Sequence, residues 1–138
     1  MSTLKQILNE CDKFANFCGM RLTTVTEGYA RAEMTVGGHH LNAAGVCQGG
    51  VYFTLADLAF AAVMNSHGPV TLGVQNCVTY MQSAREGDTL IAEAEEIKNH
   101  HRMPYGQVRI TNQRGELLCV VTGTAYRKNE RFSFDGLE

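Results

Sequence analysis

The sequence lacks the features that would place a protein outside the cell or in a membrane. Its N-terminus has no basic segment followed by an apolar core and a small-residue cleavage site. The longest apolar stretch, Val51–Met64, is interrupted by Thr54 and Asp57 and is shorter than the roughly 20 residues that span a bilayer. The five cysteines are odd in number and form no C-x-x-C pair, which argues against a disulfide framework and a structural zinc site. We therefore expect a cytoplasmic protein with reduced thiols.

The chain also has little net charge. With a formal charge of −2, it offers no general electrostatic reason to bind nucleic acid or an anionic membrane, so a polyanionic ligand needs a local basic patch. The 138 residues fit a single domain, residues 1–138, without repeats or linkers. The mostly polar residues 128–138 predict a mobile tail or a partner contact.

Hydrophobic spacing predicts the order of the elements. Apolar residues three and four apart predict an N-terminal amphipathic helix over Leu4–Phe17, ended by Gly19. A wide, alanine-rich apolar face predicts a buried helix over Gly49–Ser66. The remaining pattern predicts six strands: Arg21–Thr26, Tyr29–Val36, Val70–Gln82, Thr89–His101, Tyr105–Gln113 and Leu117–Arg127. Strands clustered around one central helix indicate an α+β fold with an antiparallel sheet wrapped over that helix.

One segment, Asn42–Asp57, contains residues that suggest chemistry. Gly49 and Gly50 open the buried helix although glycine is a poor helix former. They could let a thioester carbonyl approach the free N–H groups of the first turn, where an oxyanion would be stabilised. The alternative is that they only allow tight packing, and at this point both readings stay open.

Asp57 is the second unusual residue of this segment, because a carboxylate on an apolar helix is costly to bury unless it is paired or used. Desolvation would raise its pKa and make it a better base. The alternative places Asp57 on an exposed stripe. Eight residues, about 12 Å of helix, separate it from Gly49. If both serve one site, two antiparallel copies of the helix must share that site across a two-fold dimer interface.

The segment resembles the hotdog-fold acyl-CoA thioesterase superfamily, and most closely its phenylacetic-acid-pathway (PaaI-like) branch. The family pattern is Asn, Gly, His-Gly-Gly and then Leu-x-Asp. The matching residues are Asn42, Gly45, Gln48-Gly49-Gly50 and Leu55-Ala56-Asp57. Further likeness lies at Asn65–Gly68, Val78–Met81 and Glu86–Leu90, so that the resemblance extends from about Leu4 to Arg127.

The resemblance implies a curved antiparallel sheet around a long central helix, and homodimers that pair into homotetramers with active sites at dimer interfaces. It implies hydrolysis of an acyl-CoA to an acid and free coenzyme A, without a cofactor or metal. Asp57 would activate or orient water, the Gly49 N–H would polarise the carbonyl, and Asn42 would position carbonyl or water. Gln48 and Gly50 would contact the substrate.

Two positions depart from the family pattern. Gln48 replaces the common His and cannot carry a proton at neutral pH, so only an orienting role survives. Gly73 stands where some members place a Ser or Thr that holds water, next to the substrate. These departures motivate an alternative, a non-catalytic module that binds acyl-CoA. A hotdog dehydratase is a third reading, but no His lies in the helix near Asp57.

The remaining candidates are basic residues, cysteine and histidine. Coenzyme A carries three phosphates, and Arg85, Lys98 and Arg102 could contact them, or could form an ordinary solvated face. Cys47 adjoins the glycines, but no His is implied beside it, so we interpret it as a small loop residue. The pairs His39-His40 and His100-His101 have no acidic or Cys partner at ligand spacing and are interpreted as surface residues.

Overall fold

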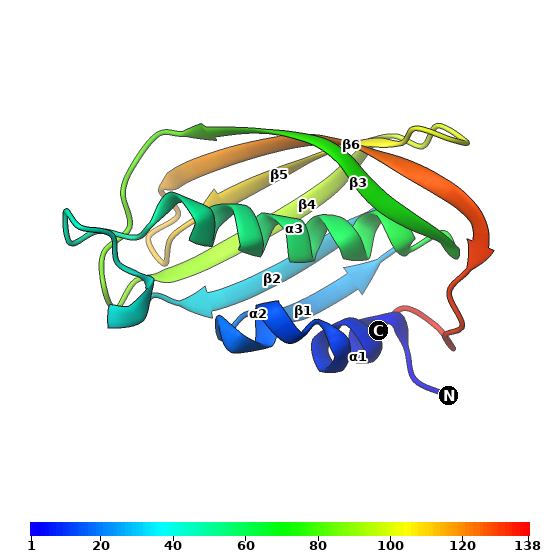
Figure 1. Cartoon of the computed structure of the whole chain (residues 1–138), viewed down its shortest axis with the longest axis horizontal. Helices are drawn as coiled ribbons and strands as arrows, with labels where there is room; N and C mark the ends of the chain where they lie inside the picture. The colour runs from blue at the N-terminus through cyan, green and yellow to red at the C-terminus, as the bar shows by residue number, and fades with distance from the viewer.

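The computed structural model describes all residues, 1–138 (Figure 1). Three α-helices and one short 3-10 turn accompany six strands. The helical segments are α1 (Leu4–Cys11), α2 (Lys13–Phe17), η1 (Gly38–His40) and α3 (Gly49–Asn65). The strands are β1 (Arg21–Thr26), β2 (Tyr29–Thr35), β3 (Pro69–Tyr80), β4 (Thr89–Lys98), β5 (Tyr105–Thr111) and β6 (Leu117–Arg131). All six predicted strands and the central helix are confirmed, with end points that differ by a few residues.

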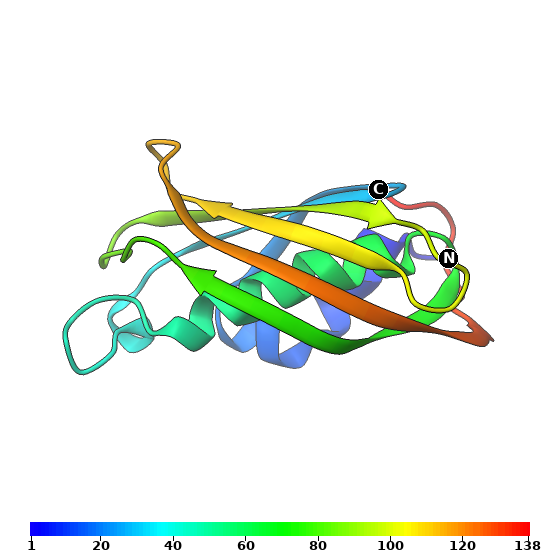
Figure 2. The same cartoon turned by 90° about the horizontal axis from the view of Figure 1, so that it is seen from above.

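The strands form one antiparallel sheet in the order β1-β2-β4-β5-β6-β3. Figure 1 shows that this curved sheet wraps around α3, and Figure 2 shows that the strands cross the helix obliquely. The predicted α+β hotdog arrangement is therefore confirmed. Because β3 lies at one end of the strand order, one of its two edges has no neighbouring strand within the chain.

The core lies between α3 and the concave face of the sheet. Ten of the 17 residues of α3 are buried, as its wide apolar face predicts. The strands beside it present small side chains, with Ala30 and Ala32 on β2 opposite Ala94 and Ala92 on β4, all fully buried. Small residues let the helix approach the sheet closely. No helix of the structure combines the length and apolar character needed to cross a membrane.

The N-terminal helix differs from the prediction, because it is broken at Asp12. Asp12 ends α1 and is the N-cap of α2, where its side chain accepts a hydrogen bond from the Ala15 N–H at 3.0 Å. An Asp side chain competes with the backbone for hydrogen bonds and so favours a cap over a helix interior. Hydrophobic periodicity continues across Asp12 and hides the break. Gly19, with φ of 76°, follows α2 as expected.

The C-terminal segment also differs from the expected mobile tail over residues 128–138. Strand β6 continues to Arg131 rather than ending at Arg127. Beyond it the chain returns to α1, where the Leu4 N–H donates to the Gly136 carbonyl and the Lys5 N–H to the Leu137 carbonyl, both at 3.0 Å. These bonds satisfy N–H groups that a helix start leaves free. Both termini therefore lie together beside α1 (Figure 1).

Candidate active site

A cavity of about 370 Å³ lies at the start of α3, where the loop before the helix meets the end of β3. It is lined by Asn42 and Cys47 from the loop, by Gly49 and Tyr52 from α3, and by Tyr80 from β3. Asn42 and Gly49, two of the predicted site residues, thus line the same cavity. Met81, Gln82 and Ser83, which follow β3, complete the wall.

The Gly49 N–H is the free donor in this cavity. Gln48 is the N-cap of α3, and its side-chain oxygen accepts a hydrogen bond from the Gly50 N–H at 2.6 Å. The Val51 N–H donates to the Gln48 carbonyl at 3.0 Å. No hydrogen-bond acceptor within the chain lies in range of the Gly49 N–H. Gln48 and Gly50, predicted to contact substrate, are thus bonded to each other, and Gly49 carries the unused partial positive charge of the helix start.

Close packing by Tyr80 explains why position 49 is a glycine. The Tyr80 hydroxyl donates to the Gly49 carbonyl at 2.9 Å. A Cβ added at Gly49 would lie 2.9 Å from the Tyr80 hydroxyl oxygen and 3.1 Å from its ring. The packing interpretation of Gly49 is therefore supported by the close approach of Tyr80. The glycine also lines the cavity with an N–H that has no acceptor, so its role toward a carbonyl stays a prediction. Tyr80 itself was recognised only as part of a strand motif, since a tyrosine in a strand carries no signal of this contact.

Asn42 shapes the loop before the helix. Its side-chain oxygen accepts hydrogen bonds from the Ala44 N–H at 2.9 Å and the Val46 N–H at 3.2 Å. The side-chain oxygen is therefore occupied, while the side-chain NH₂ group has no partner within the chain and remains free as a donor. This arrangement limits Asn42 to donating toward an oxygen of a ligand in the cavity.

Asp57 projects from the middle of α3 at an exposed position, as the alternative interpretation of this residue expected. It lies in a cleft beside Phe53, Phe60 and Asn76, and no hydrogen-bond donor of the chain contacts its carboxylate. Although the side chain is solvent-accessible in the single chain, the cleft walls partly desolvate its carboxyl group, and this desolvation, followed by the negative charge of Asp12, raises its pKa above the ordinary value. An unpaired carboxylate with a raised pKa is suited to accept a proton from water.

Gly73 also belongs to the surroundings of Asp57. Both residues line a second cavity, between the C-terminal half of α3 and the first residues of β3. Gly73 lies at a register irregularity of β3, and a Cβ added there would meet only the Asn76 side-chain nitrogen, at 3.9 Å. Neither backbone conformation nor space requires a glycine here. A serine or threonine hydroxyl would fit at this position beside Asp57.

The predicted residues thus fall into two groups that the single chain keeps apart. Gly49 and Asn42 line the cavity at the start of α3, while Asp57 and Gly73 line the cavity two turns further along the helix. About 12 Å of helix axis separates Gly49 from Asp57. One substrate carbonyl cannot contact both groups within one chain.

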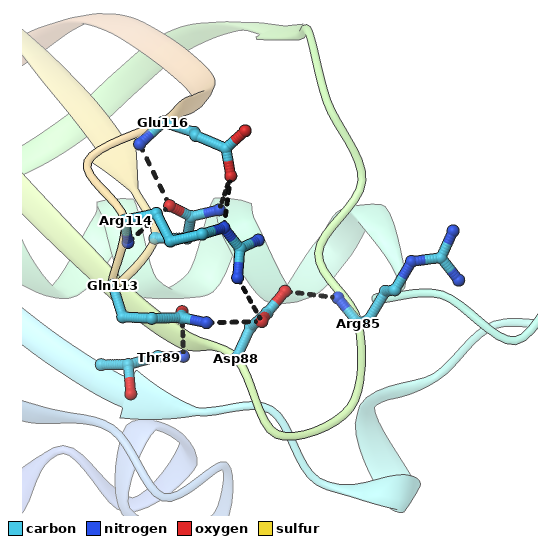
Figure 3. A network of polar contacts seen from close by, with 7 residues as sticks. Arg85, Asp88, Thr89, Gln113, Arg114 and Glu116 are labelled. Carbon is cyan, nitrogen blue, oxygen red and sulfur yellow. Dashed lines mark hydrogen bonds and ion pairs between the residues drawn. The ribbon is translucent and has the colours of Figure 1, made fainter.

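Arg85 lies on the loop after β3, two residues beyond the cavity wall at Ser83. Figure 3 shows how this loop is held. Asp88 accepts from the Arg85 N–H at 2.9 Å and from the Gln113 side chain at 2.8 Å, and these bonds lower the pKa of the Asp88 carboxyl. Arg114 is paired with Glu116 at 2.7 Å. No carboxylate pairs with the Arg85 guanidinium, which extends away from the network (Figure 3).

The side chains of Cys47, His40 and His67 are held by contacts within the fold. Burial raises the pKa of the Cys47 thiol to about 11, so it is protonated at neutral pH. The interpretation of His40 as a surface residue is wrong, because His40 is buried and bonded to the Gly37 N–H and the Cys18 carbonyl. His67 lies between Glu96 at 2.6 Å and Glu27 at 3.3 Å, at the end of α3. No cluster of three or more His, Cys, Asp or Glu side chains is placed to hold a metal ion.

Comparisons with known proteins agree on one family. The family model of the thioesterase superfamily matches residues 44–119. A putative esterase of Archaeoglobus fulgidus is 41% identical over 94% of this chain and 84% of its own. The acyl-coenzyme A thioesterase PaaI of Escherichia coli is 30% identical over 86% of this chain and 84% of its own, and its solved structure matches 95% of this chain and all of that chain with a TM-score of 0.87. A Streptococcus mutans protein solved with bound acetyl-CoA is 25% identical, with a TM-score of 0.79 over 82% of this chain and 91% of its own.

Proposed function

Because the chain belongs to the thioesterase superfamily and is a thioester hydrolase of its PaaI-like branch, we propose that it cleaves an acyl-CoA into a carboxylic acid and free coenzyme A. The observation that carries the proposal is the pair of unused groups on α3. The Gly49 N–H has no acceptor and the Asp57 carboxylate has no donor, although each lies in a cavity. Free groups of these two kinds are what addition of water to a thioester requires.

In the proposed reaction, Asp57 takes a proton from a water molecule as the water oxygen attacks the thioester carbonyl carbon. The carbonyl oxygen becomes an oxyanion, which accepts a hydrogen bond from the Gly49 N–H at the positive end of the helix. The carbon–sulfur bond then breaks, and the proton passes to the departing coenzyme A thiolate. The free NH₂ group of Asn42 donates to the carbonyl oxygen or to the water.

We further propose that the site forms between two copies of the chain, with Asp57 of one facing Gly49 of the other. Two surfaces support this dimer. The free edge of β3 exposes Leu72, Val74 and Tyr80, and the exposed side of α3 beside it carries Phe53 and Asp57. An unpaired strand edge and an exposed apolar surface are the features that a dimer interface covers. The homotetramer and the cytoplasmic location stay predictions.

Coenzyme A brings three phosphates, and Arg85 is proposed to bind one of them. Its guanidinium has no carboxylate partner, and Arg85 follows Ser83 of the Gly49 cavity wall by two residues. Arg85→Ala should raise KM for acyl-CoA with little change in kcat. Arg21→Ala is a matched control, because Arg21 is also exposed and unpaired but lies on β1. Equal KM values for the two variants would exclude this role.

The experiment that tests the proposed function compares the wild type with Asp57→Asn on a panel of acyl-CoAs. Free thiol is measured as product, and acyl-CoA binding is measured by calorimetry on the same samples. Asparagine keeps the size of the side chain but cannot accept the proton, so a loss of about 10²–10⁴-fold in kcat is expected with binding retained. Wild-type binding without turnover would support the non-catalytic module instead. Full activity of Asp57→Asn would exclude Asp57 as the base.

A further inference from the structure

The second cavity, at Asp57, continues well past the reacting groups. It has a volume of about 220 Å³ and follows α3 from Asp57 past Ala61 to Asn65. Eight residues of helix correspond to about 12 Å of depth. Gly73 and the start of β3 form the opposite wall. An acyl group whose carbonyl lies at Asp57 would find this cavity directly beyond the reaction centre.

Most residues that line this cavity belong to α3 or β3, and the two that do not are Leu8 and Phe132. Leu8 belongs to α1, and Phe132 follows β6 immediately. The two chain ends that carry them are fastened to each other, since the Leu4 N–H donates to the Gly136 carbonyl at 3.0 Å and Lys5 pairs with Glu138 at 3.3 Å. This wall is therefore built from the two termini of the chain.

Beyond Asp57, the polar side chains that line the cavity are Asn65 and Thr71, and both are already hydrogen-bonded within the chain. The Asn65 side-chain oxygen accepts from the Thr71 N–H at 2.7 Å, and its NH₂ group donates to the Ala61 and Thr71 carbonyls at 2.8 and 3.1 Å. The Thr71 hydroxyl donates to the Pro69 carbonyl at 3.0 Å. A ligand hydroxyl group that lies beyond Asp57, beside Asn65 and Thr71, would lose its water without gaining a partner, which is unfavourable.

Charge near the cavity mouth excludes a second class of ligand. Asp57 lines this cavity, and no Lys or Arg does. A dicarboxylic acyl group would bring a second carboxylate into a cavity that offers it no positive partner, which is unfavourable.

The volume limits the size of the ligand. An engineered apolar cavity of about 150 Å³ binds benzene, so 220 Å³ has room for a six-carbon ring with a short spacer. An extended chain advances about 1.2 Å per bond, which follows from about 3.6 Å per three-bond residue, so a depth of about 12 Å fits roughly ten bonds. The two limits together correspond to an acyl group of roughly six to ten carbons.

We propose that this cavity binds the acyl group of the substrate, a proposal that rests on the proposed function. The acyl group is uncharged and unhydroxylated and has roughly six to ten carbons, and Leu8 and Phe132 limit its length. Specificity is then determined by the chain termini, whereas the chemistry belongs to the segment from Asn42 to Asp57. The wall residues contact substrate only through apolar surface. Their substitution should change chain-length preference.

Two matched pairs of variants test the proposal, with kcat/KM measured for acyl-CoAs from two to sixteen carbons. Phe132→Ala should raise the activity ratio of twelve over six carbons by about tenfold, and Phe134→Ala, which changes a phenylalanine outside the cavity, should not. Leu8→Trp should lower activity on eight carbons by about tenfold, and its neighbour control Ile7→Trp should not. Thermal unfolding confirms that each variant is folded.

The outcomes separate this inference from the proposed function. No turnover of any acyl-CoA by the wild type would overturn the proposed function and this inference with it. Turnover with a length preference that neither Phe132→Ala nor Leu8→Trp changes more than its control would overturn this inference alone. Faster turnover of a hydroxyphenylacetyl-CoA than of phenylacetyl-CoA, or of succinyl-CoA than of hexanoyl-CoA, would overturn the chemical class assigned to the cavity.

Discussion

Substitution of Gly49 by proline would remove the proposed oxyanion donor while keeping the helix start. Gly49 is the first residue of α3, where proline is well tolerated because the N–H of that position has no helical partner. Gln48 before it has φ of −67° and ψ of 139°, the extended conformation that a residue preceding proline adopts. The backbone is therefore already compatible with Gly49→Pro, and the variant should fold.

Gly49→Ala is the matched control for this variant. Both substitutions add a Cβ that must share space with the Tyr80 hydroxyl, 2.9 Å away, so both displace Tyr80 to a similar extent. Only the proline removes the N–H. The difference between the two variants therefore measures the hydrogen bond itself, separately from the steric effect.

The expected magnitude follows from the role of the donor. Loss of one oxyanion donor reduces kcat by about 10²–10³-fold, about 2.7–4 kcal/mol of transition-state stabilisation. KM should change little, because the oxyanion forms only during attack. Thiol release from an acyl-CoA measures both constants. Equal kcat values for Gly49→Pro and Gly49→Ala, in folded protein, would refute the assignment of the Gly49 N–H as the donor.

Four further predictions concern the same groups. Asp57→Ala and Gly49→Pro chains, mixed in equal amounts and reassembled, should regain about one quarter of wild-type activity. Half of the dimers are then mixed, and each mixed dimer has one intact site of its two. No recovery of activity would place the site within one chain. Since desolvation raises the Asp57 pKa, kcat/KM should fall as pH drops through that raised value. An unchanged pH profile in Asp57→Asn would contradict the assignment of this pH dependence to Asp57. The same variant should raise the melting temperature at neutral pH, because it removes an unpaired charge. Gly73→Ser should raise kcat while keeping the fold, because a side chain there meets only Asn76 at 3.9 Å, and Gly73→Ala is its control. Gln48→Ala should lower the free energy of unfolding by about 1 kcal/mol in urea titration through loss of the Gly50 cap, and an unchanged value would show that the cap contributes nothing.

The sequence predicts the elements of this fold well because their signals are local. The strand pattern of β2 and the wide apolar face of α3 each follow from a few neighbouring side chains. The break at Asp12 escapes prediction because the apolar spacing continues through it, and only the bond from Ala15 reveals a new cap. The docking of residues 135–138 on α1 is equally hidden, since it depends on backbone bonds between the two ends of the chain.

In the candidate site, too, local features are predictable from the sequence and long-range contacts are not. Asn42, Gly49 and Asp57 are recognisable by type and spacing, and helix geometry alone places Gly49 and Asp57 about 12 Å apart. The contact of Tyr80 with Gly49 and the effect of Asp12 on Asp57 are not recognisable, because each joins segments that are distant in the sequence. Such contacts depend on how strands and helices pack, which local residue patterns do not encode.

The position of Gln48 has a consequence for the chemistry. As the cap of α3 it occupies the Gly50 N–H at 2.6 Å, which leaves the Gly49 N–H as the one first-turn donor that faces the cavity without a partner. A residue that cannot carry a proton therefore still contributes, by restricting where an oxyanion can be bound. Proton transfer then depends on Asp57 alone among the residues of α3. The proposed site thus needs two copies of one helix, one to supply the donor and the other to supply the base, and the wall formed by Leu8 and Phe132 selects the acyl group that reaches them.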